Sequence, residues 1–259
     1  MSRGVWAIIP ARLGSTRFPE KVLASETGKP LVAHVCDRAA AAVGAEYVRV
    51  ATDHDSITDA VEAAGYAAVR TDPAHPNGTS RVAEAARVLG LAEDAVVVNV
   101  QGDEPEIEPE AIRGAAALVT PEPSRDDIIG TVASPFAIGE DAASPHVVKV
   151  ATTAAGVGIG VRRAMYFSRS LIPHARDGGP CERLRHVGLY AASVAALRRY
   201  VALPATPAEA AECLEQLRWL EHGLEMRVAV VSCRGRGVDT PEDYRAVVER
   251  WRQNASRRE

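Results

Sequence analysis

Short apolar runs alternate with amphipathic segments over the first 120 residues. Four runs have the length and apolar character of strands, at residues 5–11, 47–52, 66–70 and 95–100. Four segments between and after them carry apolar side chains at helical spacing, at residues 29–43, 56–64, 80–89 and 109–119. Strands that alternate with helices in this way predict an α/β fold built on a doubly wound, mostly parallel sheet.

The second half of the chain has a different pattern, in which strands follow one another with little helix between them. Strands are predicted at residues 128–138, 146–151, 185–193 and 226–232, and helices at 194–201, at 207–223 after Thr206, and from Pro241 onward. Thr240 and Asp243 form a capping box for the last helix, and the Gly-rich residues 154–160 predict a flexible turn. We therefore predict one domain over residues 1–259, with an embedded α+β subregion at about 130–220.

Charged side chains follow three of the predicted parallel strands. Right-handed crossovers bring the loops after residues 5–11, 47–52 and 95–100 to the same carboxyl edge of the sheet, where ligands bind. That edge collects five charged residues: Arg12, Arg17, Lys21, Asp53 and Asp103. Residues 12–21 (RLGSTRFPEK) combine three cations with Gly, Ser and Thr, a composition that favours polyphosphate binding. From these ten residues alone, a solvated basic loop remains the alternative.

Composition excludes several functional classes. The formal net charge of −4 gives no overall basic field, so we expect no nucleic-acid partner. The four cysteines are scattered, which predicts reduced thiols in a cytoplasmic protein, and no apolar stretch approaches the ~18 residues that span a membrane. Walker A, H-E-x-x-H and G-x-S-x-G sequences are absent, which argues against a P-loop NTPase, a zinc protease and a nucleophile-elbow hydrolase.

Two aspartates are candidate ligands for magnesium. Asp103 follows the most apolar predicted strand, and Mg²⁺ carried by a nucleotide prefers one or two carboxylates besides phosphate oxygens and water. Asp239 precedes the last helix. Each could instead be an ordinary turn or capping residue. Only 3 of the 30 basic residues are lysine, and because one of them is Lys21, the compact ammonium of that residue favours the phosphate interpretation. Together these residues predict phosphoryl or nucleotidyl transfer.

Eight sequence blocks in a fixed order resemble the 3-deoxy-manno-octulosonate (KDO) cytidylyltransferase family, which makes CMP-KDO from CTP. The blocks are IIPARLGSTRFPEK, ATDHD, NGTSR, VVVNVQGDEP, YFSR, RHVGLY, LEQLR and GVDTPED, spread over about residues 5–250. The resemblance implies a nucleotide-diphospho-sugar transferase fold of the GT-A-like Rossmann type, with an embedded dimerisation region, and a reaction that requires CTP and Mg²⁺. It also implies a homodimer.

The resemblance further implies a role for each matching residue. The CTP site would consist of Arg12, Ser15, Arg17, Lys21, Thr52, Asp53, Arg81 and Gln101, and the Mg²⁺ ligands would be Asp103 and Asp239. Arg12, Lys21, Asp103 and Asp239 would act in catalysis. The acidic sugar would contact Arg169, His186, Tyr190, Glu215 and Gln216.

Three departures from the family pattern keep alternatives open for the acceptor. Ser80 stands where an acidic residue is usual, residues 144–146 read SPH in place of an asparagine-containing sequence, and the chain is longer around residues 154–160. The arginine-rich and alanine-rich composition also fits GC-rich bacteria without lipopolysaccharide. We expect KDO as the acceptor. A small phosphonate such as phosphonoformate is the alternative, and a non-catalytic nucleotide-binding protein is a lesser one.

Overall fold

Four parallel strands form the N-terminal half of the sheet. They are β1 (Trp6–Ala11), β2 (Val48–Thr52), β3 (Ala67–Arg70) and β4 (Val96–Asn99), in the spatial order β3-β2-β1-β4. The crossovers contain α1 (Leu31–Val43), α2 (Asp55–Ala63) and α3 (Gly78–Val88), with the short 3₁₀ helices η1 (Lys21–Leu23) and η2 (Ala45–Tyr47), and α4 (Pro109–Ala117) follows β4. The predicted α/β alternation is confirmed, because short apolar strands buried on both faces require helices on either side.

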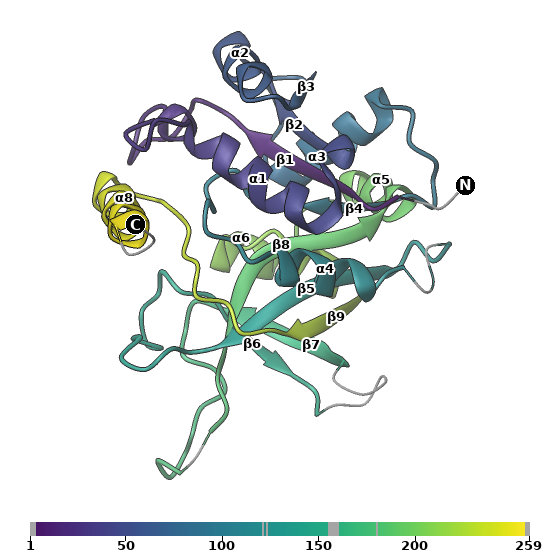
Figure 1. The fold of residues 1–259 in the computed structure, drawn as a ribbon. Coiled ribbons are helices and arrows are strands. Elements are labelled where there is room, and N and C mark those ends of the chain that lie inside the picture. The colour runs from purple at the N-terminus through teal and green to yellow at the C-terminus, as the bar shows by residue number, and fades with distance from the viewer. Residues whose placement is uncertain (1–3, 121, 123, 155–160, 180, 257–259) are drawn as a thin grey trace.

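The remaining strands extend the same sheet. They are β5 (Ile128–Pro135), β6 (Lys149–Thr152), β7 (Val161–Ser168), β8 (Leu184–Ser193) and β9 (Glu225–Val230), and the full order is β3-β2-β1-β4-β8-β5-β9-β7-β6. β8 runs antiparallel between β4 and β5, while β5 and β9 are parallel. The sheet is therefore parallel in its first half and mixed in its second. The computed structural model describes residues 4–120, 122, 124–154, 161–179 and 181–256 (Figure 1).

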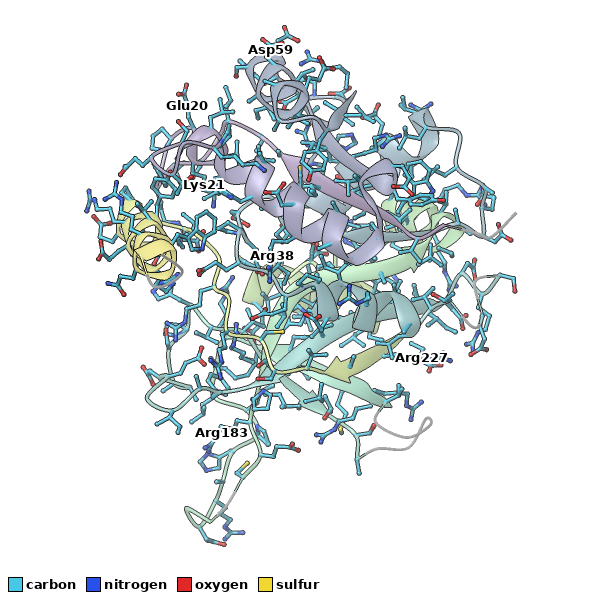
Figure 2. All side chains as sticks on the ribbon, viewed as in Figure 1. Glu20, Lys21, Arg38, Asp59, Arg183 and Arg227 are labelled. Carbon is cyan, nitrogen blue, oxygen red and sulfur yellow. The ribbon has the colours of Figure 1, made fainter. Side chains whose placement is uncertain are left out.

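Helices cover both faces of this sheet. Apolar residues of α1, α2 and α4 pack on one face around Ile9, Val50 and Val98, all fully buried. On the other face, α3 packs with α5 (Val194–Ala202), α6 (Pro207–Glu212) and α7 (Gln216–Glu221) around Ile8 and Val97. Charged side chains such as Glu20 and Asp59 project from the periphery (Figure 2). Adjacent strand residues thus face opposite layers, as the pleat of a β-strand requires.

The last helix, α8 (Pro241–Ser256), packs outside the two main layers (Figure 1). Val238, Tyr244, Val247 and Val248 are buried against Leu31 at the start of α1. The predicted capping box is confirmed, since Thr240 Oγ1 accepts a hydrogen bond from Asp243 N and Asp243 Oδ2 accepts one from Thr240 N. This packing brings Asp239 to the loop that follows β1.

Two sequence interpretations differ from the structure. The single helix predicted over 207–223 is wrong: α6 ends at Glu212 and α7 begins at Gln216, because Cys213 takes a left-handed φ of 52°. Apolar spacing misleads here, since Ala208 before the break and Leu217 after it pack in one cluster. The second difference is β7, where the sequence pattern predicts no strand. Much of β7 is exposed or half-buried, so it lacks an apolar run. The Gly-rich turn predicted at 154–160 lies, beyond Ala154, outside the described residues.

Candidate active site

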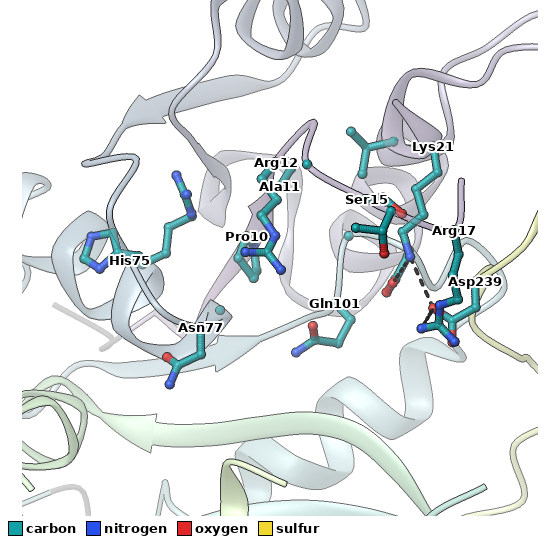
Figure 3. A pocket seen from close by; sticks show the side chains of 17 residues that line it. Pro10, Ala11, Arg12, Ser15, Arg17, Lys21, His75, Asn77, Gln101 and Asp239 are labelled. Atoms are coloured by element: carbon teal, nitrogen blue, oxygen red, sulfur yellow. Dashed lines mark hydrogen bonds and ion pairs between the residues drawn. The ribbon is translucent and has the colours of Figure 1, made fainter. Parts of the chain in front are cut away.

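A pocket of about 380 Å³ opens at the carboxyl ends of β1 and β4 (Figure 3). Eight residues predicted from the sequence line it: Arg12, Ser15, Arg17, Lys21, Arg81, Gln101, Asp103 and Asp239. They come from four segments of the chain that the carboxyl edge of the sheet and the start of α8 bring together. The volume is within the range of sites for small ligands. The structure therefore assembles one polar site from residues that are more than 200 positions apart.

Lys21 lies at the centre of the charged end of this pocket. Its Nζ donates to Asp103 Oδ2 at 2.6 Å and to the Val238 carbonyl at 2.9 Å, and lies 3.4 Å from Asp239 Oδ1. Arg17 pairs with the same Asp239 oxygen at 3.1 Å. Arg12 forms no ion pair with any residue that the structure describes. The charged end is thus a cluster of three cations and two carboxylates.

The arrangement of Asp103 and Asp239 fits a hard divalent cation. Both carboxylates have an oxygen within 3.4 Å of a single atom, Lys21 Nζ, so their oxygens converge on a small volume. No group of three or more His, Cys, Asp or Glu side chains in the described part of the chain forms a metal site by itself. One or two carboxylates are nevertheless sufficient for Mg²⁺ when a nucleotide and water supply the other oxygen ligands.

Close backbone contact between β1 and the QGDEP turn positions Asp103. A Cβ built on Gly102 would lie 2.8 Å from the Pro10 carbonyl oxygen. Only glycine allows this approach. Val238 N also donates to the Asp103 carbonyl at 2.8 Å, which fastens the segment before α8 to the same turn.

Arg81 marks the other end of the pocket. It is 3% exposed, donates through Nη1 to Thr71 Oγ1 at 2.7 Å and pairs with Asp53 at 3.2 Å. Asp53 therefore contacts Arg81 and does not itself line the pocket. Thr52 does not line it either; it is fully buried, and its hydroxyl accepts from His54 N at 3.3 Å. The predicted nucleotide roles of Thr52 and Asp53 stay predictions.

Residues that the sequence-based prediction did not include also line the same pocket, among them Pro10, His75, Asn77 and Gly78. His75 Nε2 and Glu84 Oε2 are 2.6 Å apart, and this hydrogen bond lowers the pKa of Glu84. Asn77 caps α3 by accepting from Ser80 N at 2.8 Å. The available signal was Asn77 as an N-cap, because it marks the start of α3, and N–H groups that remain free at a helix N-terminus can bind an anion or a polar ligand.

Four of the five predicted acceptor residues gather in an interior network beside β8. Tyr190 donates to Gln216 Oε1 at 3.0 Å, and the rings of His186 and Tyr190 have centroids 5.6 Å apart. Burial lowers the pKa of His186 to about 3 and raises the pKa of Glu215 to about 7, although hydrogen bonds from Thr79 oppose the second shift. None of these side chains lines the pocket at β1 and β4.

Arg169 is the fifth predicted acceptor residue, and it lies apart from the other four. Its Nε donates to the Glu212 carbonyl at 2.9 Å and its Nη1 to the Pro145 carbonyl at 3.1 Å. No hydrogen bond connects it to His186, Tyr190, Glu215 or Gln216 in the part of the chain that the structure describes. The structure thus brings the predicted CTP residues into one pocket and divides the predicted acceptor residues between two adjacent regions.

Comparisons with known proteins give a consistent result. The family model described as cytidylyltransferase matches residues 6–227. A 3-deoxy-manno-octulosonate cytidylyltransferase of Anaeromyxobacter dehalogenans (strain 2CP-C) is 50% identical over 242 residues, covering 93% of this chain and 95% of the relative. The protein of the same name from Nitratidesulfovibrio vulgaris (strain DP4) is 44% identical over 256 residues, covering 97% and 98%.

Solved structures show the same likeness. CMP:2-keto-3-deoxy-manno-octonic acid synthetase in complex with CTP superposes with a TM-score of 0.86 at 36% identity, covering 97% of this chain and 99% of the other. UDP-glucose pyrophosphorylase superposes with a TM-score of 0.62 at 12% identity, covering 96% and 98% of the two chains. The second likeness concerns the fold alone, and it agrees with the nucleotide-diphospho-sugar transferase architecture expected from the sequence.

Proposed function

The chain belongs to the 3-deoxy-manno-octulosonate cytidylyltransferase family, and we propose that it transfers CMP from CTP to KDO and releases pyrophosphate. The observation that carries this proposal is the convergence of Arg12, Arg17, Lys21, Asp103 and Asp239 on one pocket. Three cations beside two carboxylates suit a triphosphate with its metal ion. As a cytidylyltransferase, the chain is a nucleotidyltransferase enzyme.

The chemistry follows from the charge distribution in this pocket. A hydroxyl oxygen of the acceptor attacks the α-phosphorus of CTP, a new P–O bond forms, and the bond from the α-phosphorus to the bridging oxygen breaks in line. The proton of the hydroxyl passes to solvent, and pyrophosphate leaves. Arg12, Arg17 and Lys21 neutralise the charge that develops on the leaving group. Ser15 and Gln101 orient the substrate, and this positioning contributes the remainder of the rate enhancement.

We propose Mg²⁺ as the cofactor, held by Asp103 and Asp239. When bound, the ion supplies Lewis-acid stabilisation of phosphate oxygens. The two aspartates have converging oxygen atoms and belong to no metal-binding group of three or more His, Cys, Asp or Glu side chains among the described residues, which supports a metal that arrives with its nucleotide. Because Lys21 contacts both carboxylates, its ammonium must share them with the metal or turn towards the phosphates.

KDO is the acceptor that the relatives favour, and the phosphonate alternative is not favoured. The curated relatives compared above carry the KDO name, and their similarity extends over at least 93% of this chain. The non-catalytic alternative loses support because every predicted cation and carboxylate of the charged pocket is retained. His186, Tyr190, Glu215 and Gln216 form the side of the acceptor site nearest β8 in this proposal.

We propose that the enzyme is a cytoplasmic homodimer. CTP is a nucleotide of the cell interior, and all four cysteines, each in a described part of the chain, are free thiols. No helix among the described residues is long and apolar enough to cross a membrane. Exposed Met165 and Tyr166 support a partner surface on β7. Sedimentation analysis of the purified chain tests the dimer.

The decisive experiment is pyrophosphate release from CTP and Mg²⁺ against a panel of acids that includes KDO, other ulosonic acids, sialic acid and phosphonoformate. We expect turnover with KDO and little with the others. Turnover with phosphonoformate but not KDO would reverse the acceptor assignment. Activity with ATP or GTP but not with CTP would refute the nucleotide assignment.

A further inference from the structure

One strand, β6, separates the end of β7 from β8, the strand that carries two of the proposed acceptor residues. Ser168 is opposite Lys149 of β6, and Lys149 is opposite Arg185 of β8, so the three residues form one row across the sheet. Arg169 lies one residue beyond this row, and His186 lies one residue beyond it on β8. The row therefore places Arg169 close to the start of the interior network of His186 and Tyr190.

The Arg169 guanidinium is held by neutral hydrogen-bond acceptors. Its Nε and Nη1 donate to the backbone carbonyls of Glu212 and Pro145, and no carboxylate forms an ion pair with it among the described residues. Its Nη2 has no hydrogen-bond partner in the same part of the chain. Carbonyl oxygens fix the plane of the fork, and the Glu212 carboxylate binds the backbone N of Arg169 without forming an ion pair with its guanidinium. A fixed guanidinium without such an ion pair is suited to bind a carboxylate.

Glu212 anchors the backbone beneath this guanidinium. Its carboxylate accepts from Ser168 Oγ at 2.6 Å and from Arg169 N at 2.9 Å. Glu212 is also the last residue of α6, directly before the left-handed Cys213 and the turn that leads to Glu215 and Gln216. One side chain thus joins the end of β7 to the helix break that positions two other acceptor residues.

Lys149 holds the opposite side of Arg169. This lysine is fully buried, and its Nζ donates to the carbonyls of Ser144 at 2.9 Å, Val147 at 2.7 Å and Arg169. Pro145, whose carbonyl orients the Arg169 guanidinium, lies inside the loop that Lys149 fastens. Three converging carbonyls match the three donors of an ammonium, whereas a planar guanidinium does not fit them. This explains a lysine here in a chain with 3 lysines among 30 basic residues.

We propose that Glu212 and Lys149 are positioning residues of the acceptor site: they hold Arg169 so that its Nη2 binds the carboxylate of the incoming acid. Neither residue lines the CTP pocket, so both act on the acceptor and not on the nucleotide. This inference rests on the proposed function, because it requires an acidic acceptor.

The test is Glu212→Gln, which keeps the size of the side chain but replaces one carboxylate oxygen by an NH₂ group that only donates. The variant can therefore accept only one of the two hydrogen bonds from Ser168 Oγ and Arg169 N. Steady-state pyrophosphate release gives the KM for KDO and for CTP separately. We expect the KM for KDO to rise about tenfold, as for one lost hydrogen bond to a charged group, with the KM for CTP within twofold of wild type.

Glu221→Gln is the matched control, since Glu221 also accepts from a backbone amide of the same helix pair, Ala208 N at 3.0 Å, and does not contact Arg169. It should leave both KM values unchanged. If Glu212→Gln only loosened the packing, its KM values for KDO and for CTP would rise together, and this result would overturn the proposal. An unchanged KM for KDO would overturn it as well. Lys149→Met is a second variant, for which we also expect a higher KM for KDO and a KM for CTP within twofold of wild type.

Failure of the proposed function has a different signature. If the wild-type enzyme uses an acid other than KDO, the acceptor assignment is wrong, and the same KM comparison is made with that acid. If the wild-type enzyme uses no acidic acceptor, both proposals are refuted. If it uses KDO and the variants show no selective effect, only the positioning role is refuted.

Discussion

The Lys21 ammonium and the Asp103 carboxylate form a 2.6 Å ion pair between residues 82 positions apart in the sequence. Lys21 is 13% exposed and Asp103 30%, so the pair is only partly screened by water. A carboxylate proposed to bind a metal is thus already paired with a cation proposed to bind phosphate. This relationship makes the two residues mutually dependent, and each gives a separate prediction.

Asp103→Asn removes the negative charge while it keeps the shape of the side chain. We expect turnover to fall by about 100-fold or more, because the proposed Mg²⁺ would lose one of its two charged ligands. The measurement is Mg²⁺-dependent pyrophosphate release at saturating CTP and KDO. Asp59→Asn, on the exposed face of α2, is the control and should keep full activity (Figure 2). Normal turnover of Asp103→Asn would refute the metal-ligand assignment.

Lys21→Met removes the cation that contacts both aspartates. Without CTP, we expect the affinity for Mn²⁺ to increase on the order of tenfold, because the ion no longer competes with an ammonium 2.6 Å from Asp103. Free Mn²⁺ measured by electron paramagnetic resonance tests this independently of activity. Lys29→Met, which breaks the pair between Lys29 and Asp37 on α1, is the control. Equal or weaker Mn²⁺ binding by Lys21→Met would contradict the competition.

Gly130→Ala tests the contact between β5 and α4. The new Cβ would lie 2.3 Å from the Ala115 carbonyl oxygen and 3.2 Å from Leu118 Cβ, so the helix must move away from the sheet. We expect the free energy of unfolding to fall by about 3 kcal/mol. Gly114→Ala on α4 meets Val231 Cγ2 at 3.4 Å and Ala229 Cβ at 3.6 Å, both ordinary contacts, and should be neutral or slightly stabilising. Urea denaturation measures both, and a similar effect of the two changes would show that the close approach is not important.

His186 predicts a pH dependence of stability. Burial lowers its pKa to about 3, from an ordinary value of 6.5. Between these values the unfolded chain binds a proton that the folded chain does not, so stability falls as the pH decreases from 6.5 towards 3, by ~1.4 kcal/mol per pH unit. His186→Gln removes this contribution, and the loss of unfolding free energy between pH 7 and pH 5 should shrink by about 2 kcal/mol.

Denaturant titration at the two pH values measures this difference. His34, whose pKa burial lowers to about 4, contributes to the same window in both proteins and cancels in the comparison. His146→Gln, at an exposed position in the loop before β6, is the control. An equally steep loss of stability in His186→Gln and wild type would show that His186 is accessible to protons in the folded chain.

The sequence by itself determined the alternation of strands and helices and the cations that follow β1, because apolar periodicity and local charge are properties of neighbouring residues. It also indicated the capping box at Thr240, which depends on residues three positions apart. The break between α6 and α7 was missed, since apolar spacing continues through Cys213 while one backbone torsion changes the direction of the chain. His75 was missed for a related reason: only the fold brings its loop to the pocket.

Tertiary structure alone decided how these elements combine. The position of β8 between β4 and β5 follows from long-range strand pairing that no local pattern encodes. The packing of α8 against α1 brings Asp239 within 3.4 Å of Lys21, across 218 positions of sequence. The physical reason is the same in both cases. The hydrophobic effect is non-directional, so the apolar pattern indicates which segments form buried strands and helices. Which charged side chains meet depends on how these segments pack in the assembled core.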